Sequence, residues 1–204
     1  MQHFIVSTHN NEKYFLEMPH ILYYRLATQS LNNNQAYLKI NEKDPVKKGE
    51  APSRRQEELL YQCSLSMNSV HLYAALSLEG CMNYYAQRYE IHFHNDLETL
   101  PTLKKWKLYP HLKTGKAMNG KQLKLIKNIL DMRNEIAHPK PIKIKAGEPD
   151  KPTKEPAQEK MKNQDTCDVI INLNSIYDEL FRIDGDEKQW HDDNPWLQRL
   201  KKTD

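Results

Sequence analysis

The chain of 204 residues has a net charge of +3, a mean hydropathy of −0.86, and 38% hydrophobic and 28% charged residues. No stretch approaches the roughly 18 consecutive apolar residues that a membrane-spanning helix requires, and the N-terminus lacks the basic and then apolar layout of a signal peptide. These features exclude a membrane protein and predict a cytoplasmic protein built as one domain with extensions.

Cysteine and glycine usage argues against several further classes. The three cysteines, Cys63, Cys81 and Cys167, are an odd number at wide spacings, so they indicate neither a disulfide framework nor a metal knuckle. The sequence contains neither GxGxxG nor GxxxxGK followed by Ser or Thr, which argues against the familiar phosphate-binding loops of nucleotide enzymes. We therefore expect no cofactor and no metal site.

The first 50 residues are predicted to form an N-terminal extension that packs on the main body. Residues 12–31 are compatible with a helix broken at Pro19, whereas residues 35–41 alternate polar and apolar side chains as a strand does. A polar loop is predicted over residues 41–53.

The clearest element is a long central helix over residues 53–89. Ser53 is a suitable N-cap, and Glu57 and Glu58 place negative charge near the positive end of the helix dipole. Apolar residues recur every three or four positions, the period of one helical face. They are Leu60, Cys63, Met67, Val70, Ala74, Leu78, Cys81 and Tyr85.

Short helical pieces and loops are predicted over residues 90–118, before a second strong helix over residues 119–138. Asn119 provides its start, and it stops at His138, because a residue that precedes a proline is driven out of the helical region. The two strong helices are expected to pack antiparallel in an all-α bundle.

After this helix, a proline-rich and charged segment up to residue 160 predicts a loop. A last helix is predicted over roughly residues 158–182. The main domain is therefore expected to span residues 51–185, and residues 186–204 are expected to form a C-terminal tail.

Arg133 interrupts the apolar face of the second strong helix. On a helical wheel it lies in the middle of an arc formed by apolar side chains. These are Leu123, Leu125, Ile126, Ile129, Leu130, Met132, Ile136 and Ala137. A guanidinium is always charged and is costly to bury alone, so Arg133 needs a carboxylate, a row of carbonyls or an anion in a cleft. Glu79 on the long helix is the obvious carboxylate.

His138 lies about 140° from Arg133 on the same wheel, with Asn134 at the edge of the arc. The two residues form one compact site only if the helix meets its own copy across a two-fold axis. A structural alternative remains open at this point. An arginine on an apolar face more often pairs with a carboxylate, and a histidine in a last turn often binds free carbonyls.

Residues 133–138, RNEIAH, resemble the R-x4-6-H motif of the HEPN superfamily of all-helical proteins, in which a polar residue follows the arginine. Residues 73–89, YAALSLEGCMNYYAQRY, resemble the first core helix of that fold, where a run of small apolar residues carries a glutamate. The likeness covers roughly residues 53–182 in the expected order. It implies a HEPN-like bundle of about four to six helices.

Many members of this superfamily are metal-independent endoribonucleases, including toxins and antiviral defence components, that act as dimers with both motifs in one cleft. In such an enzyme the 2′-hydroxyl of the RNA is the nucleophile. The resemblance implies that His138 is the general acid and base and that Arg133 stabilises charge on the scissile phosphate. It also implies that Asn134 orients the histidine or the phosphate and that Glu79 holds the arginine.

The implied partners are a second copy of the chain, RNA, and an antitoxin or another regulatory protein. In the toxin branch paired with nucleotidyltransferase antitoxins, the motif continues to a tyrosine two positions after the histidine. Here that position is Lys140, so regulation through that tyrosine is not supported. Other members of the superfamily are inactive modules for dimerisation or for binding of protein or nucleic acid, and this alternative remains open.

Residues 101–150 contain 12 Lys or Arg but only 4 Asp or Glu, a local excess of +8. Clustered cations attract phosphates, although a solvated lysine-rich face is an equally good interpretation. Trp106 and Tyr109 lie among these lysines, as aromatic residues do on RNA-binding surfaces and at the edges of cores. The RNA-binding candidates are Lys104, Lys105, Lys107, Lys124, Lys127 and Lys140.

A weaker pattern consists of His92, His94 and Asp96, whose side chains are of metal-ligand type. His-x-His without matching ligands elsewhere is more typical of a polar loop. We therefore predict no metal site from these three residues.

Overall fold

The computed structural model describes the backbone of residues 4–9, 12–17, 19–46, 50–89, 91, 97–138, 144–145, 148–152 and 166–193. Side chains are described for residues 19–46, 50–89, 91, 97–138 and 166–189.

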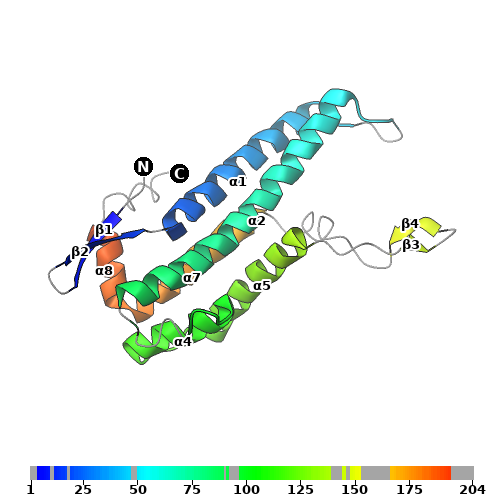
Figure 1. Ribbon diagram of the computed structural model, residues 1–204. Coiled ribbons are helices and arrows are strands. Elements are labelled where there is room, and N and C mark those ends of the chain that lie inside the picture. Colours follow the sequence, from blue (N-terminus) through cyan, green and yellow to red (C-terminus); the bar gives the residue numbers. More distant parts are fainter. Residues whose placement is uncertain are drawn as a thin grey trace.

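The body of the protein is an all-α bundle (Figure 1), as the sequence predicted. The described residues form six helices, which agrees with the four to six expected. They are α1 (Pro19–Lys43), α2 (Arg54–Arg88), α4 (Thr102–Thr114), α5 (Gly120–Ala137), α7 (Thr166–Ile183) and α8 (Gly185–Asp193). Among these helices, none combines the length and apolar character that a bilayer crossing requires.

Two antiparallel strand pairs are attached to the helical body. The first pairs β1 (Phe4–His9) with β2 (Glu12–Glu17), and the second pairs β3 (Ile144–Lys145) with β4 (Glu148–Pro152). The helical prediction for residues 12–17 was therefore wrong. The helix begins only at Pro19, because proline is tolerated in a first turn, where its missing N–H would have no helical partner.

The α1 helix lies antiparallel along α2, and this is the most extensive contact among the described elements (Figure 1). The strand prediction for residues 35–41 was wrong, since α1 continues to Lys43. Ala27 and Leu31 belong to the same buried cluster as residues of α2, α5 and α7. The expected extension thus packs on the main body and shares its core.

The α2 helix runs through the centre of the bundle, as its apolar periodicity predicted. Ser53 is the N-cap and forms a capping box with Gln56, in which each side chain accepts from the other residue's backbone N–H. Thirteen residues of α2 are buried, and all of them lie at or after Ser66. The α1–α2 pair therefore extends beyond α5 and α7 at its far end (Figure 1).

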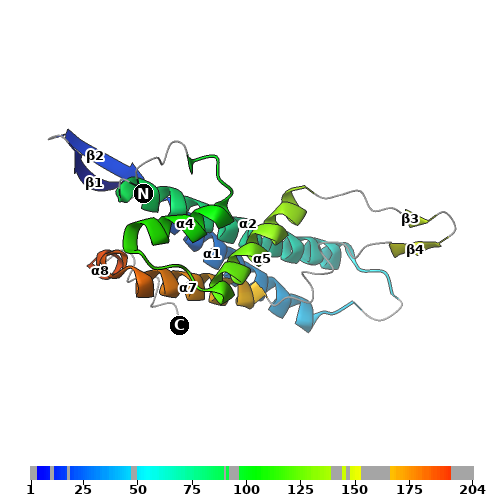
Figure 2. The same cartoon turned by 90° about the horizontal axis from the view of Figure 1, so that it is seen from below.

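Helices α4, α5 and α7 pack against α2, and α5 runs antiparallel to it, as predicted (Figures 1 and 2). The buried Trp106 on α4 donates its indole N–H to the carbonyl of Leu78 at 3.1 Å. Asn119 caps α5 through the backbone N–H of Gln122, and His138 is the C-cap, so both predicted ends of this helix are confirmed.

The last helix is observed at Thr166–Ile183, and residues 158–165 of the prediction lie outside the described residues. Within the expected tail, α8 forms because Asp184 accepts the backbone N–H groups of Asp186 and Glu187. Glu187 is 1% exposed and forms an ion pair with Arg88 at 3.1 Å, which attaches α8 to the end of α2.

Candidate functional site

Arg133 and Glu79 form an ion pair between α5 and α2. Nη2 of Arg133 lies 3.2 Å from Oε2 of Glu79, and the side chains are 30% and 39% exposed. The apolar periodicity of α5 directs Arg133 toward α2, and the contact between the two antiparallel helices brings Glu79 to meet it. The carboxylate partner predicted for Arg133 is therefore present, and the pair is open to solvent on one side.

The rest of the Arg133 guanidinium is only partly satisfied. Nη1 donates to Oδ1 of the neighbouring Asn134 at 3.2 Å. Nε is shielded from solvent and has no hydrogen-bond partner among the described residues. Buried polar groups rarely lack a partner, so this donor is an unsatisfied buried group.

A pocket of about 480 Å³ opens beside this ion pair, bounded by α2, α4, α5 and the segment that precedes α4. Its volume is in the range of ordinary ligand pockets. The charged residues in its lining are Glu79, Glu98, Lys105, Lys127, Asp131 and Arg133. Asn134 and the apolar Leu100, Leu103 and Leu130 also line it.

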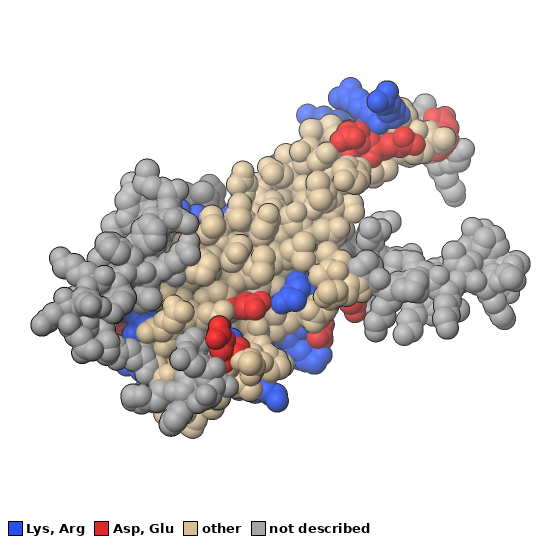
Figure 3. All heavy atoms as spheres, in the orientation of Figure 1, with Lys and Arg blue, Asp and Glu red and all other residues tan. Residues whose placement is uncertain are grey.

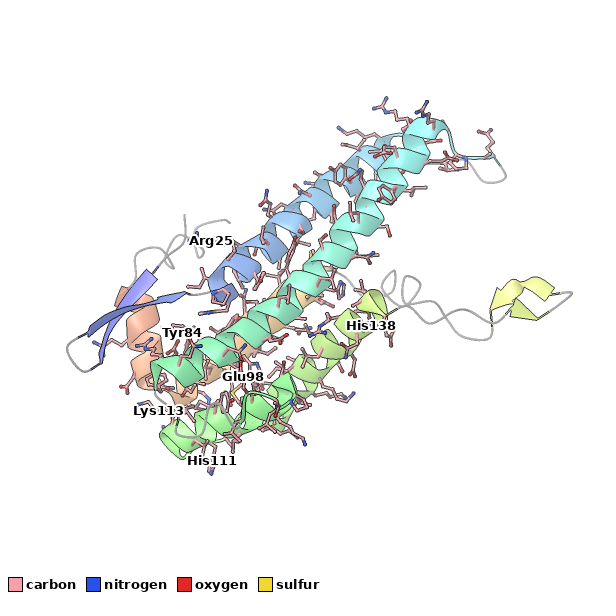
Figure 4. The ribbon with its side chains drawn as sticks, viewed as in Figure 1. Arg25, Tyr84, Glu98, His111, Lys113 and His138 are labelled. Atoms are coloured by element: carbon pink, nitrogen blue, oxygen red, sulfur yellow. The ribbon has the colours of Figure 1, made fainter. Side chains whose placement is uncertain are left out.

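His138 lies outside this pocket. It is exposed at the C-terminal end of α5 (Figure 4), and its backbone N–H closes the helix on the carbonyl of Asn134 at 3.0 Å. The residues that line the pocket include Arg133 and Asn134 but not His138. One chain thus brings Glu79, Arg133 and Asn134 together and leaves the histidine apart from them.

The predicted RNA-binding lysines do not form one uniform surface. Lys104 and Lys107 are exposed on α4 and Lys124 on α5, whereas Lys140 lies outside the described residues. Lys127 is exposed and forms an ion pair with Asp131. On the face shown in Figure 3, basic and acidic side chains of this region lie next to one another.

Lys105 contradicts its expected place on an exposed surface. Only 5% of it is exposed, and its Nζ donates to Oδ1 of Asn83 at 2.9 Å. This lysine is on the buried face of α4 with Trp106 and Tyr109, both fully buried, so these two aromatic residues belong to the core.

Comparison with family models, with curated protein sequences and with solved structures gives no match. The HEPN resemblance therefore depends on the sequence motifs alone.

The weaker metal pattern of His92, His94 and Asp96 lies outside the described residues. Within the described part of the chain, no group of three or more His, Cys, Asp or Glu side chains is arranged to hold a metal ion.

Several tyrosines with perturbed pKa values lie at the other end of α2. Burial raises the pKa of Tyr84, Tyr85 and Tyr89 well above the usual range, and the negative charge of Glu187 adds to the effect for all three. Tyr85 donates to Asp184 at 2.6 Å and Tyr89 to Glu187 at 2.9 Å. The hydroxyls of Tyr85 and Tyr89 remain protonated and hold α8 in place, so we assign them a structural role.

Reasoning from the sequence missed two features, one wall of the pocket and the partner of Lys105. Glu98 and the residues after it form a wall of the pocket, but no periodicity in this part of the sequence indicated it. Nothing in the sequence indicated that Asn83 is the hydrogen-bond partner of Lys105. A helical wheel for α4 places Lys105 beside Trp106 and Tyr109, and this was the only available signal that the lysine faces inward.

Proposed function

We propose that this protein is a metal-independent endoribonuclease of the HEPN type that acts in the cytoplasm as a homodimer, as a toxin or a component of a defence system. The observation that carries the proposal is the placement of Arg133. It lies at the interface of α5 and α2, pairs with Glu79, and lines an open pocket together with Asn134. Because 30% of the Arg133 side chain is exposed, a phosphate can reach its guanidinium.

In the proposed reaction, the 2′-hydroxyl of a ribose attacks the adjacent phosphorus. The new bond joins O2′ to phosphorus and the bond from phosphorus to O5′ breaks, which leaves a 2′,3′-cyclic phosphate and a 5′-hydroxyl. His138 takes the proton of the 2′-hydroxyl or supplies one to the leaving oxygen. Arg133 neutralises the charge that develops on the phosphate, and Glu79 and Asn134 position its guanidinium.

The proposal requires a second chain, because His138 does not line the pocket of its own chain. The α2 stripe that includes Glu79 continues at helical spacing past the end of α5, where Leu65 and Tyr61 are 48% and 61% exposed. Exposed apolar side chains on this part of α2 offer a suitable surface for a two-fold contact. We propose that the partner's copy of His138 approaches Arg133 across it.

The first test is cleavage of a synthetic RNA by the purified protein in excess EDTA, with the product ends identified by mass spectrometry. We expect cyclic phosphate ends, and at least about a 100-fold loss of rate in both Arg133→Gln and His138→Ala. His111→Ala is the matched control, since His111 is an exposed histidine in the last turn of α4 (Figure 4). Unchanged cleavage by His138→Ala would refute the mechanism.

The second test mixes the two inactive variants. If each site takes Arg133 from one chain and His138 from the other, mixed dimers contain one intact site, and a measurable part of the activity returns. If both residues act within one chain, mixing restores nothing. Sedimentation of the wild-type protein measures whether the dimer exists at the concentrations used.

A catalytically inactive HEPN module for dimerisation and for binding of protein or nucleic acid is the second candidate. The ion pair itself favours it, because Glu79 already neutralises much of the charge of Arg133. This candidate predicts no RNA cleavage under any of these conditions. It also predicts that Arg133→Gln changes the stability or the dimerisation of the protein.

A further inference from the structure

Among the described residues, the buried cation Lys105 has no carboxylate partner. It is 5% exposed, and the only acceptor near its ammonium group among the described residues is the neutral side chain of Asn83. An ammonium group carries three donors, and its charge is costly to bury unless it is paired. The other two cations in the pocket lining differ, since Arg133 pairs with Glu79 and Lys127 with Asp131.

Lys105 lies near the start of α4 and lines the same pocket. Its Nζ reaches Asn83 on α2. The lysine therefore forms part of the wall of a space that a ligand can enter. The remaining carboxylate of the lining, Glu98, is exposed to solvent and forms no ion pair with Lys105. An anion in the pocket would supply the charge that Lys105 lacks.

The first turn of α4 adds positive potential at the same place. Pro101, Thr102 and Leu103 line the pocket, and no side chain caps this helix end. The first turn contains no acidic residue, and the first N–H groups of a helix have no partner within the helix. Two features, a buried ammonium group and an uncapped helix end, thus meet at one pocket that Arg133 also lines.

We propose that this pocket binds a phosphate group, with the ammonium of Lys105 and the first N–H groups of α4 as its ligands. A phosphate has several acceptor oxygens and a charge that matches both features. Under the proposed function its source is RNA, and the phosphate is either a 5′-terminal one or an internal one beside the scissile phosphate. The binding of inorganic phosphate does not depend on that function.

The test is an NMR titration of the full chain with inorganic phosphate at constant ionic strength. We expect the backbone amide resonances of Thr102 and Leu103 to shift, and the affinity to fall at least about tenfold in Lys105→Gln. Lys116→Gln is the matched control, because it removes an exposed lysine that does not line the pocket. Lys105→Met serves as a second variant if Lys105→Gln alters the circular dichroism spectrum.

Several results would overturn the proposal. They are an absence of saturable phosphate binding, binding that leaves the amides of Thr102 and Leu103 unmoved, and equal affinity in Lys105→Gln and Lys116→Gln. Each result would show that phosphate does not bind at Lys105 and the first turn of α4.

A second arm identifies the source of the phosphate with short 2′-O-methyl oligoribonucleotides, which lack the nucleophile for cleavage. If a 5′-phosphate tightens binding and Lys105→Gln removes that gain, the pocket takes a terminal phosphate. If Lys105→Gln weakens the 5′-phosphate and 5′-hydroxyl forms equally, the pocket takes an internal one. No effect of Lys105→Gln on either form contradicts the assignment to RNA.

Failure of this inference and failure of the proposed function give different results. Phosphate binding that depends on Lys105, in a protein that does not cut RNA, retains the pocket and refutes the nuclease. RNA cleavage without phosphate binding at Lys105 supports the nuclease and refutes the phosphate site.

Discussion

Replacing Glu79 and Arg133 by neutral residues tests whether their ion pair only stabilises the fold or also positions an arginine that acts in the proposed reaction. At 3.2 Å, two unit charges attract by about 5 kcal/mol at an effective dielectric constant of about 20. Desolvation and side-chain ordering offset most of this attraction. Because the side chains are 30% and 39% exposed, we expect a net coupling of about 1 kcal/mol, close to the value for surface pairs and well below the 3–5 kcal/mol for breaking a buried one.

The assay is a double-mutant cycle of the wild type, Glu79→Gln, Arg133→Gln and the double variant, each unfolded in urea and followed by circular dichroism. We expect each single variant to lose about 1 kcal/mol of the free energy of unfolding, and the double variant to lose less than the sum. RNA cleavage by Arg133→Gln should fall far more than this change in stability explains.

Two results would refute this reasoning. A coupling above about 3 kcal/mol would show that the pair is a buried structural bond, which the 30% exposure of Arg133 does not predict. A coupling of zero, with full cleavage by Glu79→Gln, would show that Glu79 does not hold the arginine in solution.

Three further predictions concern stability. Glu187→Ala should lower the free energy of unfolding by about 3 kcal/mol in urea titrations, because it removes the buried carboxylate of the ion pair with Arg88. Asp186→Ala, which removes a 73% exposed carboxylate, should cost less than about 1 kcal/mol. Burial lowers the pKa of His71 below its unfolded value. The free energy of unfolding should therefore fall as the pH decreases below about 6.5, by up to about 1.4 kcal/mol per pH unit. His71→Leu should remove this part of the slope. Equal slopes of stability against pH for the wild type and for His71→Leu would contradict this prediction. Gly80→Leu should lower the melting temperature, because a Cβ at this position lies 3.1 Å from the backbone nitrogen of His20 on α1, and an unchanged melting temperature would show that the two helices separate easily.

The two strongest helices were predictable from the sequence, with ends correct to about one residue. Their caps are local, since Ser53 and Asn119 each bond a backbone N–H three residues later, and Pro139 forces the end at His138. The pairing of Arg133 with Glu79 was also predictable. A guanidinium in an apolar arc needs a carboxylate, a row of carbonyls or an anion, and Glu79 was the obvious carboxylate on the long helix.

Other elements were decided by contacts between distant residues. Residues 35–41 alternate in polarity, yet they form a helix because α1 continues along α2. The helix α8 has little pattern of its own and forms where Glu187 meets Arg88, 99 residues earlier in the chain. Local periodicity contains no information about such partners.

Lys105 shows most clearly the difference between what the sequence determined and what the tertiary structure decided. The sequence determined the all-α class, the two capped helices and an arginine that needs an anionic partner, because each of these follows from interactions within about four residues. Only the tertiary structure decided that Lys105 lies on a pocket wall while Lys104 is exposed, since burial depends on which face of α4 meets α2. A charge that appeared to belong to a basic surface thus lies inside the protein, beside Arg133.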